Sequence, residues 1–166
     1  FTQSTLMFAT FSPDDTRVAY VQLNNIYVEN LDSNKVTKIT SDGSTTLING
    51  TYDWVYEEEF GLRNGFRWSP DGSRIAYWQL DSEGVEMFTV INNTDSLYPK
   101  LSQFPYPKVG ETNSSARLGV IDAKGGPTAW IQLKGESRQH YPVFMEWAKN
   151  SDELVIQQLN RRQNVN

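Results

Sequence analysis

The sequence contains no cysteine, a single histidine (His140) and no long hydrophobic run. The absence of cysteine excludes disulfide bonds, thiolate metal sites and a cysteine nucleophile. A Ser-His-Asp hydrolase contained wholly within these residues would have to use His140. No stretch approaches the roughly 18 apolar residues of a transmembrane helix. The first residues also lack the basic and then apolar pattern of a signal peptide, so we expect any such peptide to be removed or to lie outside this sequence.

Basic residues are too few and too scattered to indicate a nucleic-acid-binding protein. The 166 residues include 15 Lys and Arg against 20 Asp and Glu, which gives a formal net charge of −5. Binding to nucleic acid depends on clustered basic side chains that release counterions, and Arg161-Arg162 is too short a cluster. The length suits one domain.

One sequence pattern occurs three times along the chain. The segments Phe11–Leu23, Trp68–Leu80 and Trp147–Leu159 align without a gap. Each opens with an aromatic residue, carries a β-branched residue or leucine seven places later, and ends in Gln-Leu. Self-similarity of this kind indicates a repeat architecture, in which each copy is one supersecondary unit.

The residues of the repeated segment favour a β-hairpin. Pro13 and Pro70 supply the φ angle that the second position of a turn needs, and Gly72 can adopt the left-handed conformation. Asp15 and Ser151 stand where Gly72 does, and we expect the turn with Ser151 to be the loosest. Between the copies lie further strand-like runs, bounded by polar turns, at about residues 26–31, 36–40, 87–91, 118–121 and 128–133.

About four short strands per unit are typical of a β-propeller blade. We place the units at about residues 6–50, 64–135 and 140–166, with an inserted helix at about 53–61. The sequence therefore predicts an all-β chain that forms about two and a half blades, an arc of a larger propeller. An open arc exposes strand edges, so we expect self-association. A monomer in light scattering at high concentration would contradict that expectation.

The segment between the first two copies contains three consecutive carboxylates, Glu57, Glu58 and Glu59, after Asp53. Asp53 can cap a short helix and Gly61 can end it. A solvated acidic turn is one interpretation, because carboxylates are modestly favourable near a helix N-terminus. The other is a cation site. Two neighbouring carboxylates can accept two of the three N–H bonds of a protonated α-amine, which would select ligands with a free N-terminus.

Aromatic residues surround these glutamates in the sequence. We expect Trp54, Tyr56 and Phe60 either to anchor the helix on the blade or to shield the site, and we favour anchoring. The acids of the repeat turns, such as Asp14 and Asp71, lack the further ligands of a calcium loop and are interpreted as turn formers.

Several motifs together resemble the propeller domain of the dipeptidyl peptidase IV family of prolyl serine exopeptidases. They are Asp53-Trp-Val-Tyr-Glu-Glu-Glu59, Trp68-Ser-Pro-Asp-Gly72 and Phe104-Pro-Tyr-Pro-Lys108, in matching order along the chain. The run from Glu59 to Trp68 is most similar to the bacterial members.

This resemblance implies an eight-bladed propeller that caps a C-terminal α/β-hydrolase domain of the same chain. It also implies that Glu58 and Glu59 bind the N-terminal amine of a peptide substrate, so that X-Pro or X-Ala dipeptides are released. Glu57 and Tyr56 are supporting candidates. It implies no cofactor and no metal, and it suggests a homo-oligomer that is periplasmic, secreted or attached to the cell envelope.

Some parts of the family's machinery do not occur in this sequence. The Gly-x-Ser-x-Gly motif that carries the nucleophile is missing, so we expect these residues alone to be inactive. His140 is interpreted as a structural histidine. The family's propeller also supplies an arginine for the substrate carbonyl, which cannot be assigned to Arg17, Arg63 or Arg67.

Two alternatives to the peptidase interpretation remain open. The chain could come from a propeller used only for binding, including an inactive relative of these peptidases. It could also come from a periplasmic propeller unrelated to proteolysis, because hairpins of the Ser-Pro-Asp-Gly type are widespread. The remainder of the full-length protein would distinguish them.

Overall fold

A computed structural model describes residues 6–166, which are almost entirely β-structure. The first sheet has the strand order β1-β2-β3-β4, with β1 (Met7–Phe11), β2 (Arg17–Gln22), β3 (Asn25–Asn30) and β4 (Val36–Lys38). The second has the order β11-β10-β7-β5 and also pairs β6 with β7; its strands are β5 (Leu47–Asn49), β6 (Phe66–Trp68), β7 (Arg74–Asp81), β10 (Ser115–Asp122) and β11 (Ala129–Trp130).

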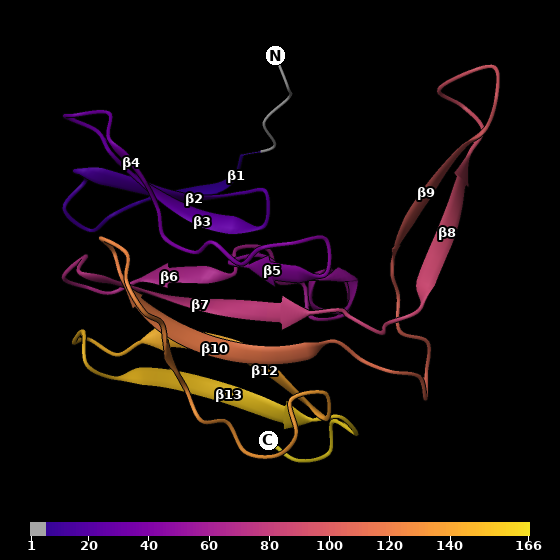
Figure 1. Ribbon diagram of the computed structural model, residues 1–166. Coiled ribbons are helices and arrows are strands. Elements are labelled where there is room, and N and C mark those ends of the chain that lie inside the picture. Colours follow the sequence, from indigo (N-terminus) through magenta and orange to yellow (C-terminus); the bar gives the residue numbers. More distant parts are fainter. Residues whose placement is uncertain (1–5) are drawn as a thin grey trace.

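The remaining strands form two antiparallel hairpins. One hairpin consists of β12 (His140–Trp147) and β13 (Leu154–Asn160), and the other of β8 (Met87–Asn92) and β9 (Lys100–Pro105). Figure 1 shows the two larger sheets and the β12–β13 hairpin stacked in chain order, while β8–β9 projects away from the stack. This arrangement confirms the predicted all-β partial propeller.

The three repeated segments all form hairpins, as predicted: β1–β2, β6–β7 and β12–β13. Asp15 and Gly72 adopt the expected left-handed conformation, with φ of 56° and 68°. The predicted strand-like runs also correspond to observed strands. Leu47–Asn49, which the repeat places at the end of its first unit, pairs with β7 in the second sheet.

The tryptophan that opens the second and the third repeat connects its strand to the preceding sheet. The indole N–H of Trp68 donates to the carbonyl oxygen of Thr10 at 3.1 Å, and that of Trp147 donates to the carbonyl oxygen of Arg67 at 3.2 Å. The two bonds occupy equivalent places in the repeat, because each acceptor directly precedes the opening aromatic of the previous copy. The repeat therefore encodes contacts between blades as well as the hairpins.

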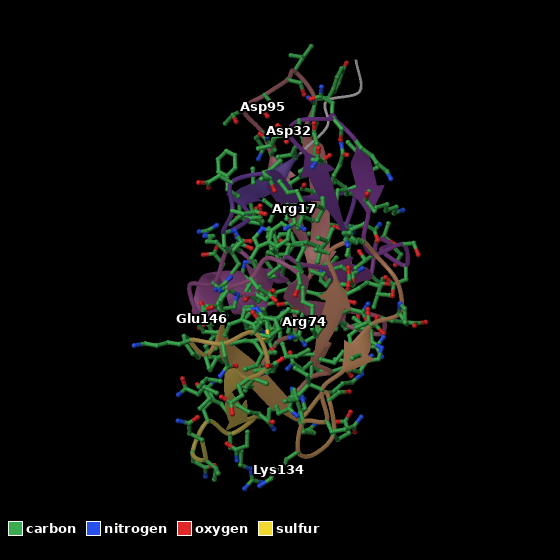
Figure 2. The ribbon with its side chains drawn as sticks, turned by 90° about the vertical axis from the view of Figure 1, so that its left-hand side faces the viewer. Arg17, Asp32, Arg74, Asp95, Lys134 and Glu146 are labelled. Atoms are coloured by element: carbon green, nitrogen blue, oxygen red, sulfur yellow. The ribbon has the colours of Figure 1, made fainter. Side chains whose placement is uncertain are left out.

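The arginine of the first two repeats adds to the same contact. The guanidinium carbon of Arg17 lies 5.2 Å from the ring centroid of Trp68, and that of Arg74 lies 5.5 Å from the ring of Trp147. Figure 2 shows the two arginines one above the other along the stack. Gly72 is favoured here by its φ of +68°, and a Cβ at this position would also lie 2.9 Å from a guanidinium nitrogen of Arg17, which would have to shift.

Two apolar clusters fill the spaces on either side of β7. Ile75 and Tyr77 face the first sheet, whereas Ala76, Trp78 and Leu80 face β12 and β13. This alternation follows the two-residue period of a strand, and both sides are buried because sheets cover both faces. Strand β7 therefore forms the centre of the arc, and its carboxyl end leads directly into the segment that carries the β8–β9 hairpin.

The repeat turns depend on a hydrogen bond between a serine and an aspartate. The hydroxyl of Ser12 donates to Asp14 at 2.5 Å, and the hydroxyl of Ser69 donates to Asp71 at 2.6 Å. These serine bonds are the main reason that the pKa of Asp14 is lowered to about 2 and that the pKa of Asp71 lies well below its usual range. Backbone N–H donors add to the effect at both turns.

We predict that the Asp14 turn loses its stabilising contribution in acid. Because the pKa of Asp14 is lower in the folded state, the contribution is present above about pH 4 and is lost as the pH falls toward 2. Asp14→Asn should therefore destabilise the protein at pH 6 and weaken the decline between pH 4 and 2. Denaturant midpoints measured across this range would test it. Asp15→Asn, which keeps the left-handed position and does not alter the Asp14 carboxylate, should retain the wild-type pH dependence.

Candidate functional site

The three glutamates lie on a single helical turn, η1 (Val55–Glu59), which is a π-helix. The carboxylate of Asp53 accepts the backbone N–H of Tyr56 at 3.2 Å, and its carbonyl oxygen accepts that of Glu57 at 3.0 Å. Gly61 ends the turn with a φ of 67°, as predicted. A π-turn is wider than an α-turn, so neighbouring side chains diverge by less than the roughly 100° of an α-helix. The π-helical geometry of this turn was not predicted from the sequence.

Tyr56 anchors this turn in the apolar core. Its side chain is 1% exposed, and its ring contacts those of Tyr52, Phe60 and Tyr141 with centroid distances of 5.7, 5.7 and 6.1 Å. Burial raises the pKa of the Tyr56 hydroxyl well above its usual value, so the group stays neutral. The side chain therefore faces into the blade, and any support that it gives to the glutamates is mechanical.

The glutamates have different surroundings. Glu57 is half-buried and forms an ion pair with Arg63, whereas Glu58 and Glu59 are exposed. Within residues 6–166, neither Glu58 nor Glu59 has a salt bridge. Glu58 and Glu59, to which the family resemblance assigns the amine, are thus available to an external cation. Glu57, to which it assigns no more than a supporting role, already has a partner.

Glu59 lies at a cavity of about 820 Å³ between the helical turn, the base of the β8–β9 hairpin and β12–β13. The walls are largely aromatic, and the charged residues among them are Glu59, Lys108 and Arg161. Its volume suits a peptide-sized ligand. The six rings that line it belong to Trp54, Phe60, Phe88, Phe104, Tyr106 and Tyr141.

The aromatic residues beside the glutamates therefore have two functions. Tyr56 is the anchor that we predicted, but Trp54 and Phe60 are only partly buried and line the cavity that contains Glu59. The amide nitrogen of Asn113, which also lines this cavity, is buried and has no hydrogen-bond partner within the described part of the chain. Burial also raises the pKa of Asp53.

The arginines considered for carbonyl binding are engaged elsewhere. Arg63 pairs with Glu57, and Arg67 lies 3.3 Å from a carboxylate oxygen of Glu146. Arg17, the first residue of β2, stacks on Trp68, the last residue of β6. The assignment of a carbonyl-binding arginine therefore stays open.

His140 occupies a structural position at the start of β12. It is 3% exposed, and its ring nitrogens lie 3.0 Å from the carbonyl oxygen of Lys134 and 3.2 Å from that of Ala116. These contacts connect the loop before β12 to β10, in keeping with the structural interpretation.

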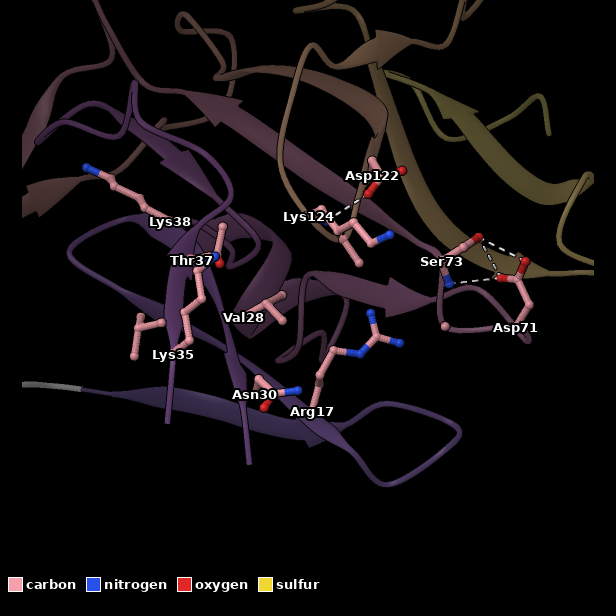
Figure 3. Close-up of a pocket in the computed structure, with 13 residues that line it drawn as sticks. Arg17, Val28, Asn30, Lys35, Thr37, Lys38, Asp71, Ser73, Asp122 and Lys124 are labelled. Atoms are coloured by element: carbon pink, nitrogen blue, oxygen red, sulfur yellow. Dashed lines mark hydrogen bonds between the residues drawn. The ribbon is translucent and has the colours of Figure 1, made fainter. Parts of the chain in front are cut away.

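A second cavity, of about 870 Å³, lies at the opposite end of β7 from the glutamates. Figure 3 shows Arg17 and Lys124 pointing into it, with Asp71 hydrogen-bonded to Ser73 at its edge. Arg17 already pairs with Asp14 and stacks on Trp68, so its charge is largely compensated. Its carboxylates, Asp71 and Asp122, accept hydrogen bonds from Ser73 and from the backbone N–H of Lys124, whereas the first cavity is lined by the exposed Glu59.

Residues 6–166 contain no group of three histidine, cysteine or acidic side chains suited to holding a metal ion. No helix in this range has both the length and the hydrophobicity to cross a membrane.

The sequence did not predict the partners of the glutamate turn. Arg63 lies shortly after the turn in the sequence, and its positive charge could have indicated an ion pair with Glu57. Tyr106 and Arg161 reach the same cavity from distant segments, and no local pattern connects them to Glu59. Only the folded arrangement of the hairpin and β13 brings them together.

Comparison with known proteins extends the resemblance to the whole described fold. The crystal structure of Porphyromonas gingivalis dipeptidyl peptidase 4 superimposes with a TM-score of 0.88 at 36% identity, and the match covers 96% of this chain and 23% of that one. Inactive dipeptidyl peptidase 10 of Rattus norvegicus is 34% identical over 98% of this chain and 21% of its own length. Dipeptidyl aminopeptidase B of Saccharomyces cerevisiae is 35% identical over 89% of this chain and 19% of its own length.

The chain thus spans about a fifth of the length of the curated relatives that it matches. The family model for the dipeptidyl peptidase IV (DPP IV) N-terminal region matches residues 2–166. The match therefore covers both the repeated hairpins and the glutamate turn. The chain belongs to the family of dipeptidyl peptidase IV N-terminal regions.

Proposed function

We propose that this segment recognises the N-terminal amine of peptide substrates for a serine-type dipeptidyl peptidase. In this proposal the full-length protein releases X-Pro or X-Ala dipeptides, and the acyl transfer takes place on a C-terminal α/β-hydrolase domain of the same chain. The propeller limits access to that domain and fixes the substrate's first residue through Glu58 and Glu59. The segment alone has no peptidase activity.

The observation that carries this proposal is the contrast among the three glutamates. Glu57 is paired with Arg63, while Glu58 and Glu59 project from a turn that is anchored through Tyr56 and have no salt bridge within residues 6–166. A protonated amine with three donors would compensate both carboxylates with short charge-assisted bonds. The aromatic cavity beside Glu59 supplies apolar walls for the peptide that carries this amine.

Amine selectivity provides the test. The full-length protein should release a dipeptide from X-Pro peptides with a free N-terminus, and cleavage of the same peptides after N-acetylation should be at least about 100-fold slower, since two charged bonds of about 1.5–3 kcal/mol each are lost. Mass spectrometry of the products would measure both rates. Equal cleavage of free and acetylated peptides would contradict amine recognition.

A binding scaffold without peptidase activity is the second candidate. The relative from Rattus norvegicus, which is named an inactive dipeptidyl peptidase, is similar over nearly the whole of this chain. Its similarity supports the idea that this propeller can be retained without catalysis. A full-length protein that binds free-amine peptides but cleaves none of them would favour this candidate.

We also propose that the full-length protein is a homo-oligomer. The β8–β9 hairpin supports this, because it carries exposed apolar side chains along both strands and at its tip. Several large apolar side chains exposed on one projecting element are typical of protein–protein contacts. The side chains concerned are Met87, Val90, Ile91, Leu97 and Leu101.

A further inference from the structure

One aromatic pair connects the β8–β9 hairpin to the glutamate turn. The ring centroids of Trp54 and Tyr106 are 4.2 Å apart, with an interplanar angle of 48°. Trp54 directly precedes the helical residues Val55–Glu59, and Tyr106 directly follows β9. The pair therefore lies between the element that carries the carboxylates and the base of the hairpin.

Tyr106 is itself held in place by the hairpin. Its backbone N–H donates to the carbonyl oxygen of Glu86 at 2.9 Å, which closes the base of the hairpin. Its ring lies 5.2 Å from that of Phe88 and 6.4 Å from that of Phe104, measured between centroids. Trp54 thus contacts a cluster of three rings that is built into the hairpin.

The glutamate turn is consequently held at two points. Tyr56 fixes it to the core of the blade, and Trp54 fixes its beginning to the hairpin. Trp54, Tyr106 and Glu59 line the same cavity, so a movement of either ring changes the wall against which the Glu59 carboxylate lies. A short turn with few backbone hydrogen bonds depends on such side-chain contacts for its orientation.

We propose that Tyr106 is a positioning residue, which orients Glu58 and Glu59 through its contact with Trp54. This inference rests on the proposed amine-binding function. Misplacement of a binding group by about 1 Å can reduce a rate by about 100-fold, so loss of this contact should weaken amine binding although no carboxylate is removed. Because the amine is bound in the ground state as well as in the transition state, the main effect falls on KM.

The test compares Tyr106→Ala with Tyr106→Phe in the full-length protein. With X-Pro peptides that have a free N-terminus, Tyr106→Ala should raise KM by about 10-fold and change kcat by less than about threefold. Tyr106→Phe keeps the ring and should restore the wild-type KM.

Hydrogen exchange supplies a readout that needs no enzymatic activity. Amides of residues 53–62 should exchange faster in Tyr106→Ala than in the wild type, and at the wild-type rate in Tyr106→Phe. Trp54→Leu should reproduce both the KM effect and the faster exchange from the other side of the contact, and it replaces Tyr106→Ala if that variant does not fold.

Two distinct failures can be separated by including Glu59→Gln. If Glu59→Gln impairs cleavage while Tyr106→Ala and Trp54→Leu leave KM and the exchange of residues 53–62 unchanged, the positioning role is wrong. If Glu59→Gln has no effect on cleavage, the proposed amine site itself is wrong. A KM that rises equally in Tyr106→Phe and Tyr106→Ala would also overturn the inference, because the phenyl ring retains the contact with Trp54.

Discussion

Replacing Glu58 or Glu59 by glutamine in the full-length protein is expected to lower kcat/KM for X-Pro peptides by about 10- to 150-fold for each residue. A hydrogen bond to a charged group contributes about 1.5–3 kcal/mol, and about 1.4 kcal/mol corresponds to a factor of ten. Glutamine has nearly the same size and keeps one acceptor oxygen. The loss therefore reports the charge rather than a change in packing, since both side chains are exposed.

Glu57→Gln is the matched control for these substitutions. Glu57 belongs to the same turn, but its partner is Arg63, in an ion pair whose side chains are 39% and 63% exposed. Exposed pairs contribute about 0–1 kcal/mol, so kcat/KM should change by less than about threefold. Steady-state kinetics on all three variants would decide the matter. A defect in Glu57→Gln as large as that in Glu59→Gln would contradict the distinct role of the last two glutamates.

Trp78→Ala is expected to destabilise the propeller by about 3–5 kcal/mol, the range for deletion of a large buried aromatic side chain. Trp78 is 1% exposed on the central strand β7, and its indole N–H donates to the carbonyl oxygen of Pro142 in β12 at 2.7 Å. The substitution would leave a cavity between the two sheets and an unsatisfied carbonyl oxygen. Since the shift per kcal/mol decreases with protein size, thermal unfolding of the full-length protein should shift down by about 2–5 °C.

Trp78→Phe separates the two contributions to this loss. It keeps most of the buried apolar area but removes the bond to Pro142, so a shift of about one third of the Trp78→Ala effect is expected. An unfolding temperature that is unchanged in Trp78→Ala would show that this contact between the second sheet and β12 does not stabilise the arc.

The hairpins could be predicted from the sequence because their signals are local. Proline at the second position of the turn and Gly72 after it determine the chain reversal, and β-branched residues follow at once. The same repeat also contains Trp68 and Arg74, but their role between blades was not predicted. That role depends on how far one sheet is rotated relative to the next, and no spacing within a copy specifies this rotation.

The candidate site was predictable only in part. The sequence placed Glu57, Glu58 and Glu59 on a short helix, and the structure confirms the helical turn but makes it a π-helix. Tyr106, which contacts Trp54, and Arg161, which lines the cavity, belong to segments that are distant from the turn in the sequence. Long insertions such as the β8–β9 hairpin carry no repeat pattern, so their final position could not be derived from the repeat.

The most direct test of amine recognition is a crystal structure of the full-length protein with an uncleaved peptide that has a free N-terminus. We predict that its α-amine nitrogen lies about 2.7–2.9 Å from a carboxylate oxygen of both Glu58 and Glu59, the usual length of a charge-assisted bond. The side chain of Glu57 should stay with Arg63. A peptide amine bound away from Glu58 and Glu59 would contradict the proposed function.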